Sequence, residues 1–273
     1  MEQILKTMLE RKSIRSYDGR EVPEEVREKL LTFAAALENP YGVPLEFRLL
    51  DGKALPGLSC PVIVGTELYL GAKCPAGPDV NEAFGYSFQQ LILYAHSLGL
   101  GTVWVGGTMD RAAFEQAMEL GDGELMPCMT PIGYPAQKRA LRDIMMRKGI
   151  SADTREPFEA LFFDGDFATP LTSTRAGILT EALEALRWAP SAVNRQPWRL
   201  LLADGAVHFY LKRSRGMPGG GSIDIQKIDM GIALAQFALA AEETGLRVRF
   251  ERTAPAPEVP EGMEYIASYR LER

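Results

Sequence analysis

The sequence is poor in the residues that build metal sites and disulfide frameworks. Its 273 residues include two histidines and three cysteines. Cys60, Cys74 and Cys128 show no C-x-x-C spacing and lie far in sequence from His96 and His208. A structural zinc site takes four closely spaced ligands of these types, and a disulfide framework takes paired cysteines. We therefore expect no metal site, and an odd number of unpaired cysteines fits a reducing cytoplasm.

The sequence also lacks a long apolar run and an excess of positive charge. No stretch approaches the roughly 20 apolar residues of a membrane-spanning helix, and Met1–Lys12 mixes charged with apolar residues, unlike a signal peptide. The formal net charge of −6 argues against a broad basic surface for nucleic acid or anionic lipid. With 46% apolar residues, the chain can form a large core. We expect a folded cytoplasmic protein with no nucleic-acid and no membrane partner.

A polar stretch in the second half has the composition of a shaped loop. Residues 189–198 read Ala-Pro-Ser-Ala-Val-Asn-Arg-Gln-Pro-Trp, and we call them the Pro-Ser loop. Proline lacks an amide donor and disfavours a helical predecessor, so this stretch is neither a regular helix nor a central strand. Ser191, Asn194 and Gln196 can both donate and accept hydrogen bonds, which suits a ring with alternating carbonyls and nitrogens. The alternative is an ordinary turn-rich connection between a helix and a strand.

Three cations and a hydroxyl lie within five residues near the start of the chain. This basic segment, Arg11-Lys12-Ser13-Ile14-Arg15, follows residues 2–10, whose apolar side chains have helical spacing. One interpretation places Arg11 and Lys12 at the end of a helix, where they interact favourably with the helix dipole. A second basic run lies after Pro135, and we expect most of it on the solvated surface. It contains Lys138, Arg139, Arg142, Arg147, Lys148 and Arg155.

Hydrophobic periodicity predicts alternating helices and strands along the whole chain. Predicted helices cover residues 2–10, 23–37, 80–97, 111–120, 176–188 and 228–243. The last of these is apolar on every side and should be buried. Predicted strands cover residues 47–50, 61–64, 101–107, 129–133, 200–203, 208–211 and 246–250. Residues 71–80 and 216–221 are rich in glycine and proline, which indicates loops.

The two halves of the sequence share an order of parts. Glu46–Leu50 matches Pro197–Leu201, and the helix ending at Ser97–Leu100 matches the helix ending at Glu243–Leu246, at an offset of roughly 146 to 151 positions. Between the halves, residues 151–170 carry five bulky apolar side chains and should be a packed crossover rather than a flexible linker. We therefore expect halves at 1–150 and 171–273. The basic segment occurs in the first half and the Pro-Ser loop in the second.

These features together resemble the nitroreductase family over nearly the whole chain. The family's Arg-Arg-Ser-x-Arg start is similar to the basic segment, and its Pro-Ser-x-x-Asn-x-Gln-Pro-Trp loop is similar to the Pro-Ser loop. Its Leu-Gly-Leu-x-x-x-x-x-Gly stretch is similar to Leu98-Gly99-Leu100 through Gly106-Gly107, and its arginine before a proline to Arg155-Glu156-Pro157.

The resemblance implies a fold and an assembly. Members have an α+β fold in three layers and ordinarily form homodimers with FMN at the subunit interface. One chain that contains both halves resembles a fused branch of the family. We accordingly expect a tandem pseudo-dimer of two related halves, each with a mainly antiparallel sheet flanked by helices. Because the symmetric contact is then internal, we expect a monomer.

The resemblance also implies site residues. The basic segment and Arg155 would bind the FMN phosphate, and the Pro-Ser loop would close over the flavin ring. Backbone amides of the glycine pair would face the edge of the ring. The expected cofactor-binding residues are Arg11, Lys12, Ser13, Arg15, Gly106, Gly107, Arg155, Pro190, Ser191, Asn194 and Gln196.

The implied function is an FMN-dependent oxidoreductase. It would pass electrons from NADH or NADPH to a small oxidised substrate such as a nitroaromatic or a quinone. The flavin carries the redox chemistry, so no catalytic side chain is expected. The alternative is a non-catalytic FMN-binding protein, a flavin store or sensor. The sequence shows no residue pattern that would recognise the 2′-phosphate of NADPH. It therefore does not distinguish NADH from NADPH as the electron donor.

The complementary halves predict one FMN per chain. Of the basic segment, only Thr174-Arg175 remains in the second half, and the asparagine and glutamine pattern of the Pro-Ser loop is absent from the first. Flavin released by heat and quantified by its absorbance should equal the protein in moles. Two flavins per chain would contradict this expectation.

Overall fold

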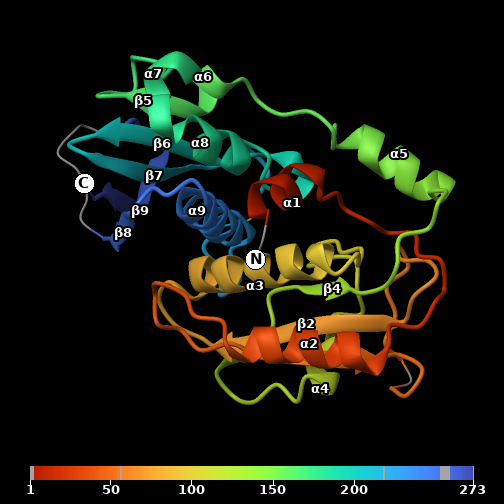
Figure 1. Cartoon of the computed structure of the whole chain (residues 1–273). Coiled ribbons are helices and arrows are strands. Elements are labelled where there is room, and N and C mark those ends of the chain that lie inside the picture. Colours follow the sequence, from red (N-terminus) through yellow and green to blue (C-terminus); the bar gives the residue numbers. More distant parts are fainter. Residues whose placement is uncertain (1–2, 56, 218, 253–258, 273) are drawn as a thin grey trace. The chain divides into compact units, whose positions relative to one another are not determined.

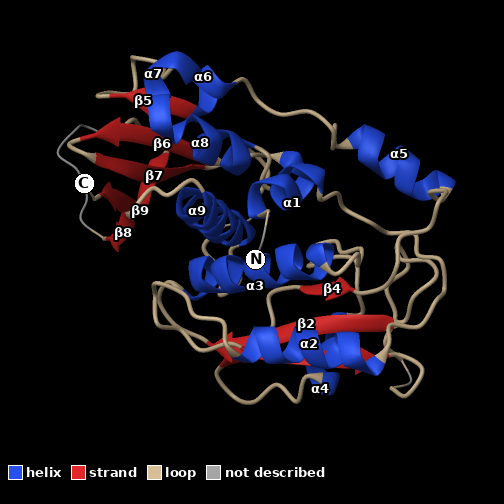
Figure 2. Cartoon of the chain, viewed as in Figure 1, coloured by secondary structure: helices blue, strands red, loops and turns tan. Residues whose placement is uncertain are grey.

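A computed structural model describes residues 3–55, 57–217, 219–252 and 259–272 (Figures 1 and 2). The chain forms two compact units. Unit 1 is built from Glu10–Ala152, and unit 2 is built from Glu2–Leu9 and Asp153–Arg273. Helix α1 (Ile4–Glu10) therefore contributes mainly to unit 2, where the Leu5 amide donates to Glu243 Oε2 at 2.6 Å.

Unit 1 contains a small antiparallel sheet. Its strands are β1 (Glu46–Asp51), β2 (Leu68–Pro75), β3 (Glu124–Leu125) and β4 (Met129–Pro131). Strand β2 is central and pairs with the other three, each time antiparallel.

Helices cover both faces of this sheet. On one face lie α2 (Glu24–Ala35) and α3 (Val80–Ser97), where Phe47 of β1 stacks on Phe88 with centroids 6.1 Å apart. Side chains alternate between faces along a strand, so Leu50 points the other way. It joins a buried cluster with Phe114 of α4 (Arg111–Ala117). Unit 1 thus has three layers, as expected.

Unit 2 contains a five-stranded sheet in the order β5-β6-β7-β9-β8. Its strands are β5 (Phe162–Asp164), β6 (Trp198–Ala203), β7 (Ala206–Lys212), β8 (Val248–Glu251) and β9 (Met263–Leu271). Strands β5 and β6 are parallel and the other pairs are antiparallel. The prediction of an α+β fold with mainly antiparallel sheets flanked by helices is confirmed.

A long buried helix packs on the sheet of unit 2. Helix α9 (Ile225–Glu243), blue in Figure 1, contacts β6, β7 and β8, and Phe237 lies edge-on to Phe209 of β7 at 5.6 Å. Helix α8 (Thr180–Arg187) covers it as well. The burial of α9 agrees with the prediction from its apolar composition on every side. Two helices of four residues in this unit are α6 (Phe158–Leu161) and α7 (Ser173–Ala176). Residues 158–164, within the expected crossover, thus form α6 and β5.

Several expected elements are wrong. Residues 71–75 belong to β2 instead of a loop, because Gly71 is needed for packing: a Cβ there would lie 2.9 Å from Met118 Sδ. Residues 61–64 form a turn with one isolated bridge at Val64, and residues 101–107 make isolated bridges instead of a ladder. Strand β9 and helix α5 (Leu141–Gly149) were not predicted. Pro218 in the loop expected at 216–221 lies outside the described residues.

None of the helices in the described part of the chain combines the length and the apolar character that crossing a membrane requires.

The close approach of two backbone segments in unit 1 depends on Gly65. This residue has a φ of +87°, and a Cβ there would lie 2.1 Å from the carbonyl oxygen of Tyr17. Gly65→Ala should therefore lower the free energy of unfolding by on the order of 3 kcal/mol, from strain and displacement together. Urea unfolding measures this. Gly77→Ala is the control, because its Cβ would meet no atom within 4 Å; equal losses in both variants would contradict the role of Gly65.

Candidate functional site

The basic segment runs as extended backbone through unit 1. Ser13 forms a parallel bridge with Thr102, and the Ile14 amide donates to the Thr102 carbonyl at 2.9 Å. On its other side, the Arg15 carbonyl accepts from the Val64 amide at 2.9 Å. The segment is therefore inserted between two backbone neighbours. Because α1 ends at Glu10, Arg11 and Lys12 directly follow the end of a helix, whereas Ser13, Ile14 and Arg15 lie beyond it.

The cations of the basic segment differ in exposure. Arg11 is 7% exposed, whereas Lys12 is exposed to solvent. The side chain of Arg15 is 11% exposed, and its Nη1 lies 3.2 Å from Asp143 Oδ1. Burying a guanidinium is unfavourable unless an anion or several acceptors surround it. Arg11 and Arg15 are thus the cations whose placement suggests a site, while the position of Lys12 is that of an ordinary surface lysine.

The glycine pair Gly106-Gly107 lies in a loop between a bridge at Val105 and helix α4. Arg111 fastens this loop, because its Nη2 donates to the Gly106 carbonyl at 2.7 Å and its Nη1 to the Met126 carbonyl at 2.7 Å. A Cβ on Gly106 would lie 3.1 Å from Cys128 Sγ, whereas one on Gly107 would meet nothing within 4 Å. Gly106 is therefore needed for packing, and Gly107 leaves its backbone open to approach.

The Pro-Ser loop in unit 2 has an unusual backbone. Val193, Asn194 and Gln196 have φ values of +43°, +59° and +47°. This region is strained for a β-branched residue such as Val193, and such strain gathers at functional sites. Hydrogen bonds within the loop hold the shape: Ser191 Oγ accepts from the Gln196 amide at 2.9 Å, and the Ser191 carbonyl accepts from the Asn194 amide at 3.0 Å. Pro190 enters the loop partly exposed.

Side chains of the loop fasten it to the segment 154–156. Gln196 is buried, and its Oε1 accepts from the Glu156 amide at 3.0 Å while its Nε2 donates to the Asn194 carbonyl at 3.2 Å. Asn194 Nδ2 donates to the Thr154 carbonyl at 3.1 Å, and its Oδ1 accepts from Arg155 at 3.3 Å. In the structure Gln196 therefore shapes the loop. Arg155 contacts the loop within unit 2, whereas Arg11 and Arg15 belong to unit 1.

Asp229 of α9 lies beneath the loop, and sequence reasoning missed it. The Ala192 amide donates to its two carboxylate oxygens at 3.0 and 3.2 Å. The side chain is fully buried, and burial raises the pKa of Asp229 well above its usual value; the Ala192 amide opposes this rise and the nearby Asp224 adds to it. The available signal was one acid inside the apolar run 228–235, because such a residue is buried only with a partner.

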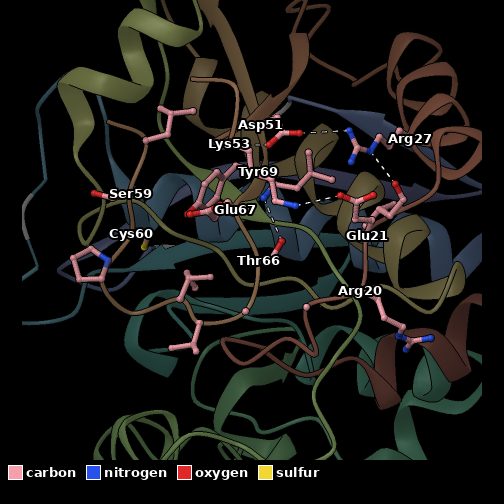
Figure 3. Close-up of a pocket in the computed structure, with 18 residues that line it drawn as sticks. Arg20, Glu21, Arg27, Asp51, Lys53, Ser59, Cys60, Thr66, Glu67 and Tyr69 are labelled. Carbon is pink, nitrogen blue, oxygen red and sulfur yellow. Dashed lines mark hydrogen bonds and ion pairs between the residues drawn. The ribbon is translucent and has the colours of Figure 1, made fainter. Parts of the chain in front are cut away.

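A cavity of about 580 Å³ lies in unit 1 next to the end of the basic segment. Figure 3 shows Arg27 facing Asp51, with Arg27 Nη1 and Asp51 Oδ2 3.7 Å apart, and Lys53 facing Glu21 at 3.2 Å. Burial raises the pKa of Tyr69, which lines the cavity, to about 12, so its phenol is protonated at neutral pH. The cavity lining includes neither the basic segment nor the glycine pair.

The described residues offer no obvious metal site. No group of three or more His, Cys, Asp or Glu side chains among them is placed to hold a metal ion. The three cysteines are buried and unbridged. His208 bonds with its two ring nitrogens to Ser268 Oγ at 2.6 Å and to the Ala203 carbonyl at 3.2 Å, as a structural histidine does.

Comparisons with known proteins agree with this architecture. A solved structure described as a "putative nitroreductase" of Thermotoga maritima superposes with a TM-score of 0.62, at 20% identity, over 98% of this chain and 92% of that chain. At this identity the likeness shows the fold, which is that of the nitroreductases. The family model described as "Putative TM nitroreductase" matches residues 3–241. The chain belongs to this family.

Two further proteins match about half of this chain. A protein of Methanothermobacter thermautotrophicus, named "Putative NADH dehydrogenase/NAD(P)H nitroreductase", is 28% identical over 158 residues, which are 52% of this chain and 82% of that protein. A protein of Desulfovibrio desulfuricans described as a "putative nitroreductase", solved in complex with FMN, is 22% identical and covers 53% of this chain and 95% of its own, with a TM-score of 0.43.

The raised pKa of Asp229 predicts a pH dependence of stability. Because the folded protein binds this proton more tightly than the unfolded chain, stability falls as the pH rises through the folded pKa. Asparagine cannot ionise and still accepts from the Ala192 amide. Asp229→Asn should therefore be more stable than the original protein at pH values above that pKa and equal to it where Asp229 is protonated.

Urea unfolding at a series of pH values measures this difference. Asp224 is the matched control, since the ion pair and hydrogen bonds that it makes with Arg213 and backbone amides lower its pKa despite burial. Asp224→Asn should lose stability above the unfolded pKa of about 4. If Asp229→Asn instead behaves like Asp224→Asn, the carboxylate of Asp229 acts in its charged form.

Proposed function

We propose that the chain binds FMN and acts as an FMN-dependent oxidoreductase. It would take electrons from NADH or NADPH and pass them to a small oxidised substrate such as a nitroaromatic or a quinone. The observation that carries this proposal is the burial of Arg11 and the low exposure of Arg15 in the segment that matches the family's phosphate motif. We also propose that the protein is a cytoplasmic monomer with one flavin.

The donors around the basic segment fit a phosphate and its attached chain of hydroxyls. Arg15 has five N–H donors, and the bond from Nη1 to Asp143 uses one of them. The Thr102 hydroxyl, beside Ser13, is buried and has no hydrogen-bond partner among the described residues. A buried hydroxyl without a partner is costly, so a ligand that supplies one accounts for it. Guanidinium and phosphate form bidentate, charge-assisted hydrogen bonds.

The Pro-Ser loop supplies groups for a flavin ring. An asparagine amide has two donor and two acceptor positions, so contact of Asn194 with the pyrimidine end is compatible with its bonds to Thr154 and Arg155. We assign to Gln196 and Ser191 the shaping of the loop, and to Arg155 the positioning of Asn194. The strained backbone of Val193 supports this assignment, because strain is retained where a loop must keep one shape.

Bound FMN would supply the hydride transfer, and the protein's own residues would bind and orient it. Arg11 and Arg15 would hold the anion. Amides next to Gly107 would approach the ring where no side chain intervenes. None of these roles requires a side chain that changes its protonation state.

The visible absorption spectrum of the purified protein is the direct test. A flavin spectrum that bleaches when NADH or NADPH is added without oxygen supports the oxidoreductase. A flavin spectrum that neither donor bleaches supports a non-catalytic FMN-binding protein. No flavin spectrum, and none after incubation with excess FMN, contradicts both.

Paired binding titrations separate the phosphate end from the ring end. Arg15→Ala should weaken FMN by about tenfold to a hundredfold and leave riboflavin unchanged, because riboflavin lacks the phosphate. Asn194→Ala should weaken both ligands by similar factors and shift the reduction potential of bound FMN. Arg142→Ala and Arg195→Ala, which remove exposed arginines of α5 and of the loop, are the controls. Equal weakening of both ligands by Arg15→Ala would refute its phosphate role.

A further inference from the structure

Helix α5 of unit 1 shows the reverse of the usual arrangement of side chains. Its buried residues are a carboxylate and a guanidinium, Asp143 and Arg147. Three of its four apolar side chains point outward: Leu141, Ile144 and Met145 are 79%, 48% and 74% exposed, and Met146 is partly buried. A surface helix is normally held by burial of its apolar face. Helix α5 is instead held through polar groups.

The polar contacts of α5 converge on the basic segment. Asp143 Oδ1 lies 3.2 Å from Arg15 Nη1, and Asp143 Oδ2 lies 3.9 Å from Arg139 Nε. Arg147 Nη1 donates to the Ser13 carbonyl at 3.4 Å. Just before the helix, the Ala140 amide donates to Ser16 Oγ at 3.0 Å. One carboxylate thus lies between cations from two parts of the sequence.

Asp143 lies between two guanidinium groups, where a bound anion could also lie. Its side chain is 3% exposed, and it brings Arg15 and Arg139 to one point. Guanidinium groups that converge on a carboxylate have the geometry to converge on a phosphate as well. A phosphate monoester carries a charge of about −1.5 to −2 at neutral pH. It would therefore compete with Asp143 for the same donors and be repelled by it.

We propose that α5 completes the phosphate end of the site. Arg147 and Arg139 bind the phosphate together with Arg15. Without a bound phosphate, Asp143 holds these cations, and the phosphate replaces Asp143 as their partner when it binds. Asp143 thereby sets how strongly the site prefers phosphorylated flavin over riboflavin. The assignment of the ligand rests on the proposed FMN binding, whereas the competition between Asp143 and an anion does not.

The first experiment compares FMN with riboflavin. Asp143→Asn keeps an acceptor for Arg15 but removes the charge, so it should strengthen FMN binding on the order of tenfold and leave riboflavin unchanged. Arg147→Ala should weaken FMN on the order of tenfold, again without an effect on riboflavin. Arg147→Lys should restore part of this loss, since it keeps the charge.

Matched controls come from the same unit and the same helix. Asp51→Asn removes a carboxylate that is paired with Arg27 away from the basic segment, at 3.7 Å. Arg142→Ala removes an exposed cation of α5 that donates to the Pro61 carbonyl. Neither should change the ratio of FMN to riboflavin affinity. A change of that ratio by Arg142→Ala as large as that by Arg147→Ala would show a general charge effect and overturn the proposal.

The second experiment uses inorganic phosphate as the probe, with melting temperature as the readout. At matched ionic strength, phosphate should stabilise Asp143→Asn more than the original protein, and Arg147→Ala less, relative to chloride. This arm works even if the protein binds no flavin, in which case the proposed function fails and the anion site stands. Equal stabilisation of all three proteins by phosphate overturns the anion site.

One result would reverse the role of Asp143. If Asp143→Asn weakens FMN as strongly as Arg15→Ala does, and phosphate stabilises it less than the original protein, Asp143 is a residue that positions Arg15, and the proposed competition is wrong. If Asp143→Asn weakens FMN and riboflavin equally, α5 acts on the fold of unit 1 and not on the anion.

Discussion

Charge burial is the constraint on which unit 1 depends. Arg11 and Arg15 lie in an extended segment whose backbone is bonded to Thr102 on one side and to Val64 on the other. The backbone contacts fix where the guanidinium groups can go, and in an environment of low dielectric each needs negative charge or acceptors close by. Helix α5 meets part of that need with Asp143. These polar contacts hold helix α5 in place although its apolar face is exposed.

Unit 2 meets a different constraint, the shape of one loop. Three residues of the Pro-Ser loop have positive φ, and none of them is glycine. Such a backbone persists when the surroundings fix it more strongly than the strain opposes it. Gln196 bonds to the segment 154–156, and Asp229 fastens Ala192 from the buried helix α9. The polar side chains of this loop therefore fix the conformation of the loop, and that conformation determines which groups the loop can present to a ligand.

Sequence reasoning located the elements in which the pattern of apolar side chains indicates which residues are buried. The apolar stripe of α3 and the all-round apolar character of α9 are strong helical signals, and both helices are present. Strand β2 carries glycine and proline, which indicate a loop locally, yet Gly71 is there because Met118 packs against it. Strand β9 pairs with β8, the preceding strand, and with β7, which is distant in sequence. Its pairing is a property of the fold.

The sequence by itself determined the fold class, the family and the two motifs, because periodicity and motif spacing are local and survive without knowledge of contacts. The tertiary structure decided how each motif residue is placed. It buried Arg11 and exposed Lys12, turned Gln196 into the loop and joined Arg155 to Asn194. It also brought Asp143 and Arg147 to the basic segment across more than 120 positions of sequence. From sequence alone, a run of cations is predicted to lie on the solvated surface. Only the fold shows which groups surround each cation, and the energy of a charge depends on those surroundings and not on its neighbours in sequence.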